Sequence, residues 1–176
     1  DSPAPGGGSV AALAGSMAAG LASMVAGLTF GKKGYTQHND LMEGVGGRAQ
    51  GLKDALLRAM DDDTEAFDRV MACFRMPKKT DEQKQAREQA VQEASKEATL
   101  VPLGVLERCP EVAELAGQVA EHGNQSSLSD AGVAGLMAAA AAAGAYYNVL
   151  INLQGIDDAE WSDDIRRRAD SALQQA

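Results

Sequence analysis

The chain has 176 residues, of which 45% are hydrophobic and only 4% aromatic, and it carries a formal net charge of −9. This length suits a single domain whose core is built from small and aliphatic side chains. The acidic balance disfavours nucleic acid and anionic membrane surfaces as partners. The two cysteines lack the spacing of a disulfide framework or a zinc site, so a reduced, cytoplasmic protein is expected.

Two long stretches, residues 3–31 and 131–156, contain no charged side chain. Both exceed the roughly 18 residues that mark a candidate transmembrane helix. Their composition is mainly Gly, Ala and Ser, which are near neutral between water and a bilayer. The length of these stretches leaves membrane insertion as an alternative. Their composition instead favours tightly packed core helices of a protein without a membrane partner.

No segment shows the sustained alternation of β-branched residues that marks a strand, so an all-α fold is predicted. Residues 1–176 are expected to form one domain, a bundle of about six helices. The predicted helices cover approximately residues 8–30, 37–75, 80–108, 110–123, 129–154, and from 157 or 158 to the end. The first and fifth, which are rich in Ala and Gly, are expected to be the inner helices.

Capping residues support two of these boundaries. Thr80 and Gln83 have the spacing of a capping box at the start of the third helix. Pro102 predicts a kink or a break near the end of that helix. Asp157 and Glu160 offer a second cap pair for the sixth helix.

The second predicted helix carries one carboxylate on its apolar face. The stripe runs with a single gap, at position 63, through Leu41, Val45, Ala49, Leu52, Leu56, Met60, Phe67, Val70 and Phe74. A helix would therefore turn Asp63 inward, whereas Asp61, Asp62 and Glu65 would face solvent. An inward carboxylate is paired, protonated or placed in a wet site, where it can act as a general acid. The structural alternative is an aspartate held by a lysine or a helix end.

A glycine run, Pro5-Gly6-Gly7-Gly8-Ser9, precedes the first helix. Its unshielded backbone N–H groups at a helix N-terminus would suit an anion or a carbonyl oxygen. A degenerate GxGxxA pattern overlaps this run, but no strand precedes it, which excludes a dinucleotide fingerprint. A flexible lead-in to the helix is the alternative.

Two amides, Asn148 and Asn152, lie four residues apart on one face of the fifth helix. In so apolar a helix they need partners, and they could bind the edge of a heterocycle or brace a neighbouring helix. The pattern slightly favours bracing. Asp130, at the start of the same helix, is interpreted as an N-cap.

Basic residues cluster at two helix ends, at Lys32 and Lys33 and again at Arg75, Lys78 and Lys79. Each cluster could hold an anionic ligand, and solvated lysines are the alternative. Further basic residues alternate with acids along the third helix and are interpreted as solvated: Lys84, Arg87 and Lys96. The two histidines lack ligand spacing, so no metal site is proposed.

In combination, these motifs resemble the cyclodeaminase domain family of formiminotransferase-cyclodeaminase over roughly residues 3–175. The segments that carry the resemblance are Pro5–Ser9, Gly31–Lys33, Asp61–Phe67, Arg75–Lys78, Val101–Leu103 and Asn148–Leu153. The resemblance implies an all-α homodimer or larger homo-oligomer. It also implies a folate enzyme that converts 5-formiminotetrahydrofolate to 5,10-methenyltetrahydrofolate and ammonia, as in histidine degradation. Methenyltetrahydrofolate cyclohydrolase is the alternative activity, and a non-catalytic folate-binding or assembly module is the alternative class.

The resemblance also implies roles for individual residues. The catalytic carboxylate of the family falls on Asp63. Substrate-binding roles fall on Gly6, Gly7, Gly8, Ser9, Lys32, Lys33, Arg75, Lys78, Asp130, Asn148 and Asn152. No metal and no cofactor beyond the tetrahydrofolate substrate are expected, and that substrate could carry a polyglutamate tail.

Overall fold

The computed structural model describes residues 6–176, and in that range it contains six α-helices and no strand. The helices are α1 (Gly7–Thr29), α2 (Asn39–Phe74), α3 (Asp81–Leu106), α4 (Cys109–His122), α5 (Leu128–Leu153) and α6 (Ala159–Gln175), with short 3-10 turns at Thr36–His38 and Gln125–Ser127. The all-α prediction is therefore confirmed, and the expected helix boundaries are close to those observed.

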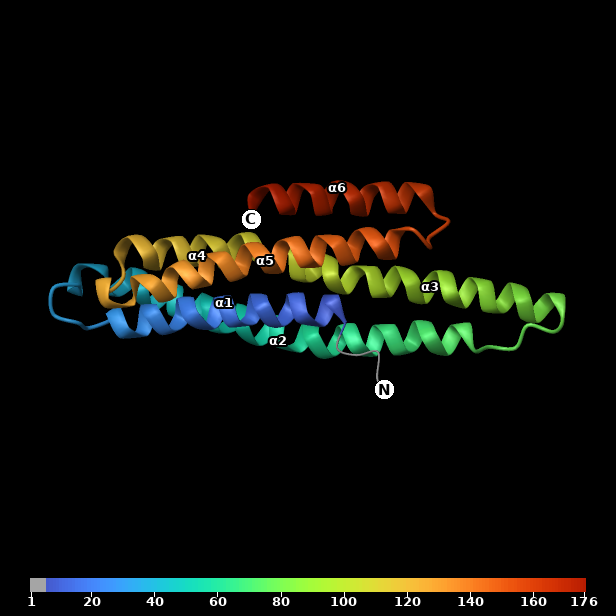
Figure 1. The fold of residues 1–176 in the computed structure, drawn as a ribbon, viewed down its shortest axis with the longest axis horizontal. Helices are drawn as coiled ribbons and strands as arrows, with labels where there is room; N and C mark the ends of the chain where they lie inside the picture. Colours follow the sequence, from blue (N-terminus) through green and yellow to red (C-terminus); the bar gives the residue numbers. More distant parts are fainter. Residues whose placement is uncertain (1–5) are drawn as a thin grey trace.

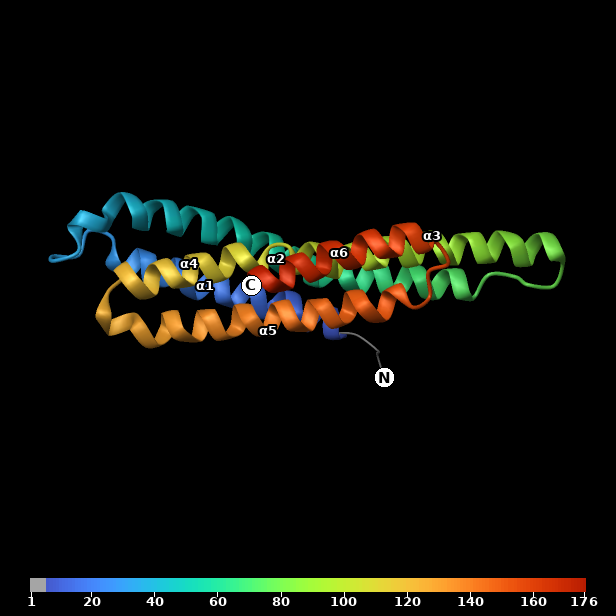
Figure 2. The ribbon, with the colours of Figure 1, turned by 90° about the horizontal axis from the view of Figure 1, so that it is seen from above.

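The longest helix, α2, runs through most of an elongated molecule (Figure 1). In one half, α1, α4 and α5 pack with it into a bundle, whereas in the other half α2 and α3 continue together as an arm (Figure 2). The short helix α6 packs on the outside, against α3, α4 and α5. Because α1 begins near the middle of the molecule, its first turn lies where the bundle gives way to the arm.

The core is built from small side chains, as the composition predicted. Five alanines of α1 are completely buried: Ala12, Ala18, Ala19, Ala22 and Ala26. A Cβ atom on Gly15 would lie 3.2 Å from Leu56 Cδ1, and one on Gly144 would lie 3.2 Å from the Cβ of Ala11. The absence of these side chains lets α1 approach α2 on one side and α5 on the other.

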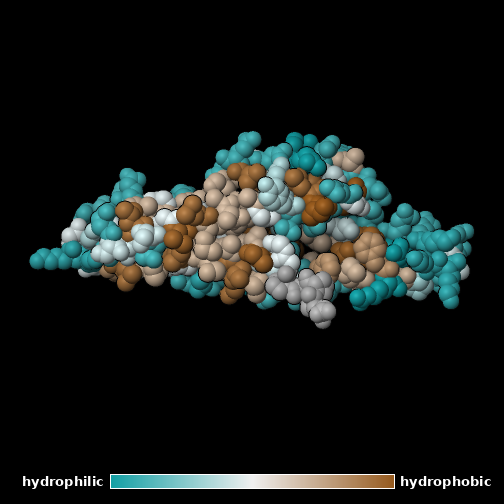
Figure 3. All heavy atoms as spheres, viewed as in Figure 1, coloured by the Kyte–Doolittle hydropathy of each residue, from teal (hydrophilic) through white to brown (hydrophobic). Residues whose placement is uncertain are grey.

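Both Ala/Gly-rich helices also have an apolar face that this chain leaves exposed. On α1 this face comprises Val10, Leu13, Met17, Met24 and Leu28, and on α5 it comprises Val133, Leu136, Tyr147 and Ile151. In the space-filling view, apolar side chains gather over the half of the molecule that contains the bundle of α1, α2, α4 and α5 (Figure 3). By length and composition alone, α1 and the segment Gln125–Leu153 could each cross a membrane. Of the most apolar 18 residues in each, 56% and 33%, respectively, are buried inside the structure.

The helix caps agree with the sequence in part. The capping box of Thr80 and Gln83 is confirmed, with Thr80 Oγ1 accepting from Gln83 N and Gln83 Oε1 accepting from Thr80 N. For α6 the expected pair of Asp157 and Glu160 is wrong, because Asp158 caps the helix by accepting from the N–H of Trp161.

Two further expectations about helix ends need correction. The N-cap of α5 is Ser127, so the cap interpretation of Asp130 is wrong; Asp130 lies in the first turn, where a carboxylate favours the positive helix end. Pro102 causes no break, because α3 continues from Asp81 to Leu106 with the proline inside it; the alternative, a kink at this residue, stays a prediction.

Candidate active site

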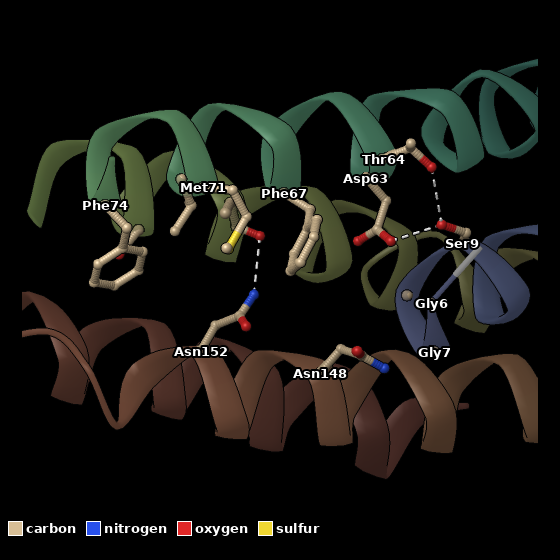
Figure 4. A pocket seen from close by; sticks show the side chains of 14 residues that line it. Gly6, Gly7, Ser9, Asp63, Thr64, Phe67, Met71, Phe74, Asn148 and Asn152 are labelled. Carbon is tan, nitrogen blue, oxygen red and sulfur yellow. Dashed lines mark hydrogen bonds between the residues drawn. The ribbon is translucent and has the colours of Figure 1, made fainter. Parts of the chain in front are cut away.

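A cavity of about 400 Å³ lies where the first turn of α1 meets α2, α3 and α5. Seven of the predicted site residues line it: Gly6, Gly7, Gly8, Ser9, Asp63, Asn148 and Asn152. The remaining lining residues are Thr64, Phe67, Val70, Met71, Phe74, Ser95 and Ala98. Figure 4 shows these side chains converging from separate helices, with the Asp63 carboxylate near the start of α1.

The Asp63 side chain is half-buried, whereas Asp61, Asp62 and Glu65 are exposed, as the helical stripe predicted. Ser9 Oγ donates a hydrogen bond to Asp63 Oδ2 over 2.8 Å. Among residues 6–176 no ion pair involves Asp63, so its carboxylate is held by a hydroxyl group at a helix end and not by a lysine. Its other oxygen is left to face the cavity.

The glycine run allows the Asp63 carboxylate to lie close to the first turn of α1. A Cβ atom on Gly8 would lie 2.2 Å from Asp63 Oδ1, and one on Gly7 would lie 3.0 Å from Asn148 Nδ2. A Cβ on Gly6 would meet nothing within 4 Å. None of the three has a positive φ, so Gly7 and Gly8 are required for space and not for backbone conformation. The interpretation of this run as a flexible lead-in does not account for these contacts.

The first turn of α1 also presents backbone donors. Gly6 is the N-cap and offers no side-chain acceptor, and the first turn contains no acidic residue. Helix geometry leaves the N–H groups of Gly7, Gly8 and Ser9 without an acceptor inside the helix. The positive end of α1 therefore faces the cavity, beside the Asp63 carboxylate.

The two asparagines have different partners. Asn152 Nδ2 donates to the carbonyl oxygen of Ala98 on α3 over 3.1 Å. That carbonyl lacks its usual helical donor because Pro102, four residues later, has no N–H. Asn152 therefore braces α5 against α3, which confirms the interpretation that the sequence slightly favoured. Asn148 Nδ2 donates to Gly144 O within its own helix over 2.8 Å, so its Oδ1 can accept from a ligand.

The long wall of the cavity is apolar and comes from the C-terminal part of α2. Phe67 and Phe74 are 41% and 47% exposed, and Val70 and Met71 lie between them. The sequence analysis placed this end of the stripe on the inward face of its helix. In the structure α1 begins opposite Asp63, so the stripe beyond that point has no α1 to cover it, and no feature of the sequence marks this change.

Comparisons with known proteins agree with this geometry. The sequence model of the family described as formiminotransferase-cyclodeaminase matches residues 1–171. The chain is 44% identical to a methenyltetrahydrofolate cyclohydrolase of Methylorubrum extorquens, over 99% of this chain and 84% of that protein. The chain belongs to the formiminotransferase-cyclodeaminase family.

Other members of this family resemble the chain over its full length. It is 35% identical to the formimidoyltransferase-cyclodeaminases of Gallus gallus and Rattus norvegicus, over 99% of this chain but only 32% of each of those proteins. The chain thus spans about a third of the length of these relatives. A crystal structure of formiminotetrahydrofolate cyclodeaminase from Thermotoga maritima superposes with a TM-score of 0.79 at 30% identity, covering 99% of this chain and 86% of that one.

Five residues to which the family resemblance gave substrate-binding roles lie outside this cavity. Lys32 and Lys33 follow the far end of α1, about 30 Å from the glycine run at 1.5 Å per helical residue. Asp130 lies in the first turn of α5, at the same end of the bundle. Arg75 caps the C-terminal end of α2 and is not part of the lining.

Lys78 is also absent from this lining and belongs instead to a separate hollow beyond Phe74. The cavity lining consequently contains one carboxylate and no basic side chain. Within the described part of the chain, no group of three or more His, Cys, Asp or Glu residues could hold a metal ion.

Proposed function

We propose that the protein is a folate one-carbon enzyme that converts 5-formiminotetrahydrofolate to 5,10-methenyltetrahydrofolate and ammonia in the cavity around Asp63. The observation that carries the proposal is the placement of a half-buried carboxylate, oriented by Ser9 and lying against Gly8, at one end of a cavity with a long apolar wall. The membership of the family, with relatives that carry both activities in their names, supports the substrate class.

The proposed reaction needs one acid near the carbon that joins N5 and N10. N10 attacks the formimino carbon and forms a tetrahedral centre, and the N10 proton passes to the formimino nitrogen. The Asp63 carboxylic acid then protonates this nitrogen, and ammonia leaves with the electron pair of its C–N bond. The product is the cationic methenyl bridge, which the resulting Asp63 carboxylate complements electrostatically.

The rest of the cavity suits the rest of a folate. The free N–H groups at the start of α1 and the Oδ1 of Asn148 offer donors and an acceptor for the polar edge of the pterin. Phe67 and Phe74 provide aromatic surfaces for the benzoyl ring. The proposed chemistry uses no cofactor other than the folate itself.

Methenyltetrahydrofolate cyclohydrolase is the second candidate, and the 44% identity to an enzyme of that name favours it specifically. In that reaction water adds to the bridging carbon and the bond to N5 breaks, giving 10-formyltetrahydrofolate and a proton. Asp63 would then accept a proton from the attacking water and return one to N5. The same cavity serves both reactions, and a role in histidine degradation is proposed only with the first.

The deciding experiment measures turnover of both substrates by the purified protein and by Asp63→Asn. We expect cyclodeaminase turnover to fall on the order of 10²-fold or more in this variant, the usual scale for a general acid, while the fold is retained. Turnover of the methenyl substrate alone would assign the second candidate. Full activity in Asp63→Asn, or no turnover of either substrate by the parent, would contradict the proposed function.

We further propose that the protein works as a homodimer through the exposed apolar faces of α1 and α5. Support comes from the length of these faces, which extend from Val10 to Leu28 and from Val133 to Ile151. A two-fold axis near the middle of α1 would pack two copies antiparallel. The Lys32–Lys33 end of one copy would then approach the glycine run of the other and bring positive charge to a cavity that contains none of its own.

Light scattering at micromolar concentration tests the homodimer. We expect twice the chain mass for the parent and the mass of one chain for Leu136→Glu, because Leu136 is 75% exposed on the α5 face. Leu57→Glu, at a 43% exposed position of α2 outside these faces, is the matched control and should remain dimeric. A monomeric parent would contradict this arrangement.

A cytoplasmic location is also proposed. Both cysteines are free in the structure, and burial raises the pKa of the Cys109 thiol to about 12, which makes it a poor thiolate. Fractionation of cells that express the natural protein would test this location.

A further inference from the structure

Ser95, on α3, differs from the other polar side chains of the active-site cavity. It is half-buried and lines the cavity, and its hydroxyl makes no hydrogen bond within residues 6–176, whereas its backbone carbonyl accepts from Thr99 Oγ1. The other polar side chains of the lining each have a hydrogen-bond partner in the protein: Ser9, Asp63, Thr64, Asn148 and Asn152. Because half-buried hydroxyls normally find a partner, the Ser95 hydroxyl is available to a ligand.

Two contacts set the register between the antiparallel helices α2 and α3. Arg87 Nε donates to the carbonyl oxygen of Phe74 over 3.2 Å, and Arg69 Nε lies 3.8 Å from Glu97 Oε2. The first contact also shows that the interpretation of Arg87 as a solvated residue is wrong, because its half-buried side chain is fixed on α2.

This register places Ser95 level with residues 66–71 of α2, about 5–12 Å beyond Asp63 at 1.5 Å per residue. The aromatic wall begins at this level with Phe67, which belongs to the same lining. In the proposed function N10 of the folate lies at Asp63. One benzene ring separates N10 from the carboxamide of folate, a length similar to one helical turn of about 5.4 Å. The carboxamide would therefore lie at the level of Ser95.

Asn152, on α5, supplies a complementary group. Its Nδ2 donates to the carbonyl oxygen of Ala98, which lies one helical turn after Ser95 on the same face of α3 (Figure 4). Its Oδ1 makes no hydrogen bond within the described chain and can accept one. A hydroxyl donor and an amide acceptor thus line one part of the cavity from two different helices. A trans amide needs this combination, because its C=O and N–H point in opposite directions.

We propose that Ser95 is a specificity-determining residue that donates a hydrogen bond to the carbonyl oxygen of the folate carboxamide. This inference rests on the proposed function, which places the reacting N5 and N10 atoms at Asp63. Asn152 Oδ1 accepts from the N–H of the same carboxamide. The two side chains recognise the bond that joins the benzoyl ring to glutamate, and they select a complete folate over a pterin whose ring carries no carboxamide.

The test measures KM and kcat of the parent and of Ser95→Ala with two substrates, each in the formimino or methenyl form that the parent turns over. One is the complete folate, and the other is an analogue in which aniline replaces p-aminobenzoylglutamate, so that N5, N10 and the ring remain. With the complete folate, Ser95→Ala should raise KM about 5-fold, the effect of one lost hydrogen bond. Its kcat should stay parental, because the contact is equally strong in the transition state.

With the aniline analogue, the parent and Ser95→Ala should have the same KM, because the group that the hydroxyl binds is missing. An equal rise in KM for both substrates, or no rise for either, would overturn the proposal. Ser95→Ala should retain the fold, since alanine has the higher helix propensity.

Two companion variants make the result specific. Ser95→Thr keeps a hydroxyl at this position and should keep most of the parental preference for the complete folate. Ser171→Ala removes an exposed hydroxyl from α6, outside the cavity lining, and should behave as the parent does with both substrates.

Binding of 5-formyltetrahydrofolate separates this proposal from the proposed function, because its formyl oxygen replaces the leaving nitrogen and no ammonia can form. By calorimetry, Ser95→Ala should bind this ligand about 5-fold more weakly than the parent, and should bind the 5-formyl aniline analogue as the parent does. A parent that shows this pattern but turns over neither folate would refute the function and retain the role of Ser95. A parent that turns over folate, with no selective loss in Ser95→Ala, would retain the function and refute that role.

Discussion

The carboxylate of Asp63 occupies the space where a side chain on Gly8 would have to lie. A Cβ atom at this glycine would be 2.2 Å from Oδ1 and 2.8 Å from Oδ2, both far inside contact distance. The first turn of α1 and the middle of α2 can therefore meet at this point only through a residue without a side chain.

Gly8→Ala should consequently displace Asp63 and lower kcat by at least about 10-fold, the effect of a small misplacement of a reacting group. The fold should persist, because alanine has the higher helix propensity. Gly51→Ala is the matched control: it lies in α2, its Cβ would meet nothing within 4 Å, and it should keep the parental kcat. Parental activity in Gly8→Ala would show that the observed position of Asp63 is not the working one.

Ser9→Ala removes the donor to Asp63 Oδ2 and should lower kcat more than it changes KM, because Ser9 positions the acid and does not reach the reacting atoms. Stability should fall by about 1 kcal/mol, the usual net value of one hydrogen bond. Ser16→Ala offers the comparison, since Ser16 Oγ donates to Lys53 O between the same two helices. It should show a similar loss of stability with normal kcat, and equal kinetic effects of both changes would refute the positioning role.

The contact between Asn152 and Ala98 predicts an energetic coupling to Pro102. Asn152→Ala should destabilise the protein by about 1–2 kcal/mol by leaving the Ala98 carbonyl without a donor. In a Pro102→Ala background the backbone N–H at position 102 can supply that donor, so the same change should cost less. A double-mutant cycle by denaturant unfolding measures this coupling, and strictly additive effects would contradict it.

The cap of α6 predicts an acid-sensitive element. A hydrogen bond from Lys96 and a second from the N–H of Trp161 lower the pKa of Asp158 below its usual value. Because the folded pKa is the lower one, the stabilisation is complete above the unfolded pKa of about 3.9 and is lost as pH falls through the folded pKa. Fluorescence of Trp161, the single tryptophan, should report this loss.

Asp158→Asn should therefore be less stable than the parent at neutral pH, and the difference should shrink at pH values below about 4. Asp163→Asn, a neighbouring change on the same helix, should track the parent at every pH. A parent–variant difference that stays constant with pH would show that the carboxylate charge of Asp158 has no part in the cap.

Much of this site could be predicted from the sequence because helical periodicity is local. The register of α2 was enough to separate Asp63 from its acidic neighbours, and the glycine run marked a helix end open to a ligand. Which helices pack against each of these elements could not be predicted from local periodicity. Nothing in the sequence showed that α1 begins opposite Asp63, so Phe67 and Phe74 resembled core residues and Arg87 resembled a surface residue.

The positions of Lys32 and Lys33 illustrate the same limit. A cluster of charge is visible in the sequence, but its distance from the glycine run depends on α1 being one uninterrupted helix. Membership of the family supplied candidate roles for these lysines without the geometry that would connect them to Asp63.

The cavity unites the first helical turn of the described chain with residues near the end of α5. Ser9 and Asp63 are 54 residues apart, and Gly7 meets Asn148 only after most of the chain has been made. During synthesis on a ribosome, the acid and its hydroxyl partner could assemble well before the wall that carries the asparagines exists. A nascent or truncated chain that ends before α5 would thus present the Asp63 carboxylate with no enclosed space around it, and we expect it to show no turnover of the proposed substrate until α5 has emerged.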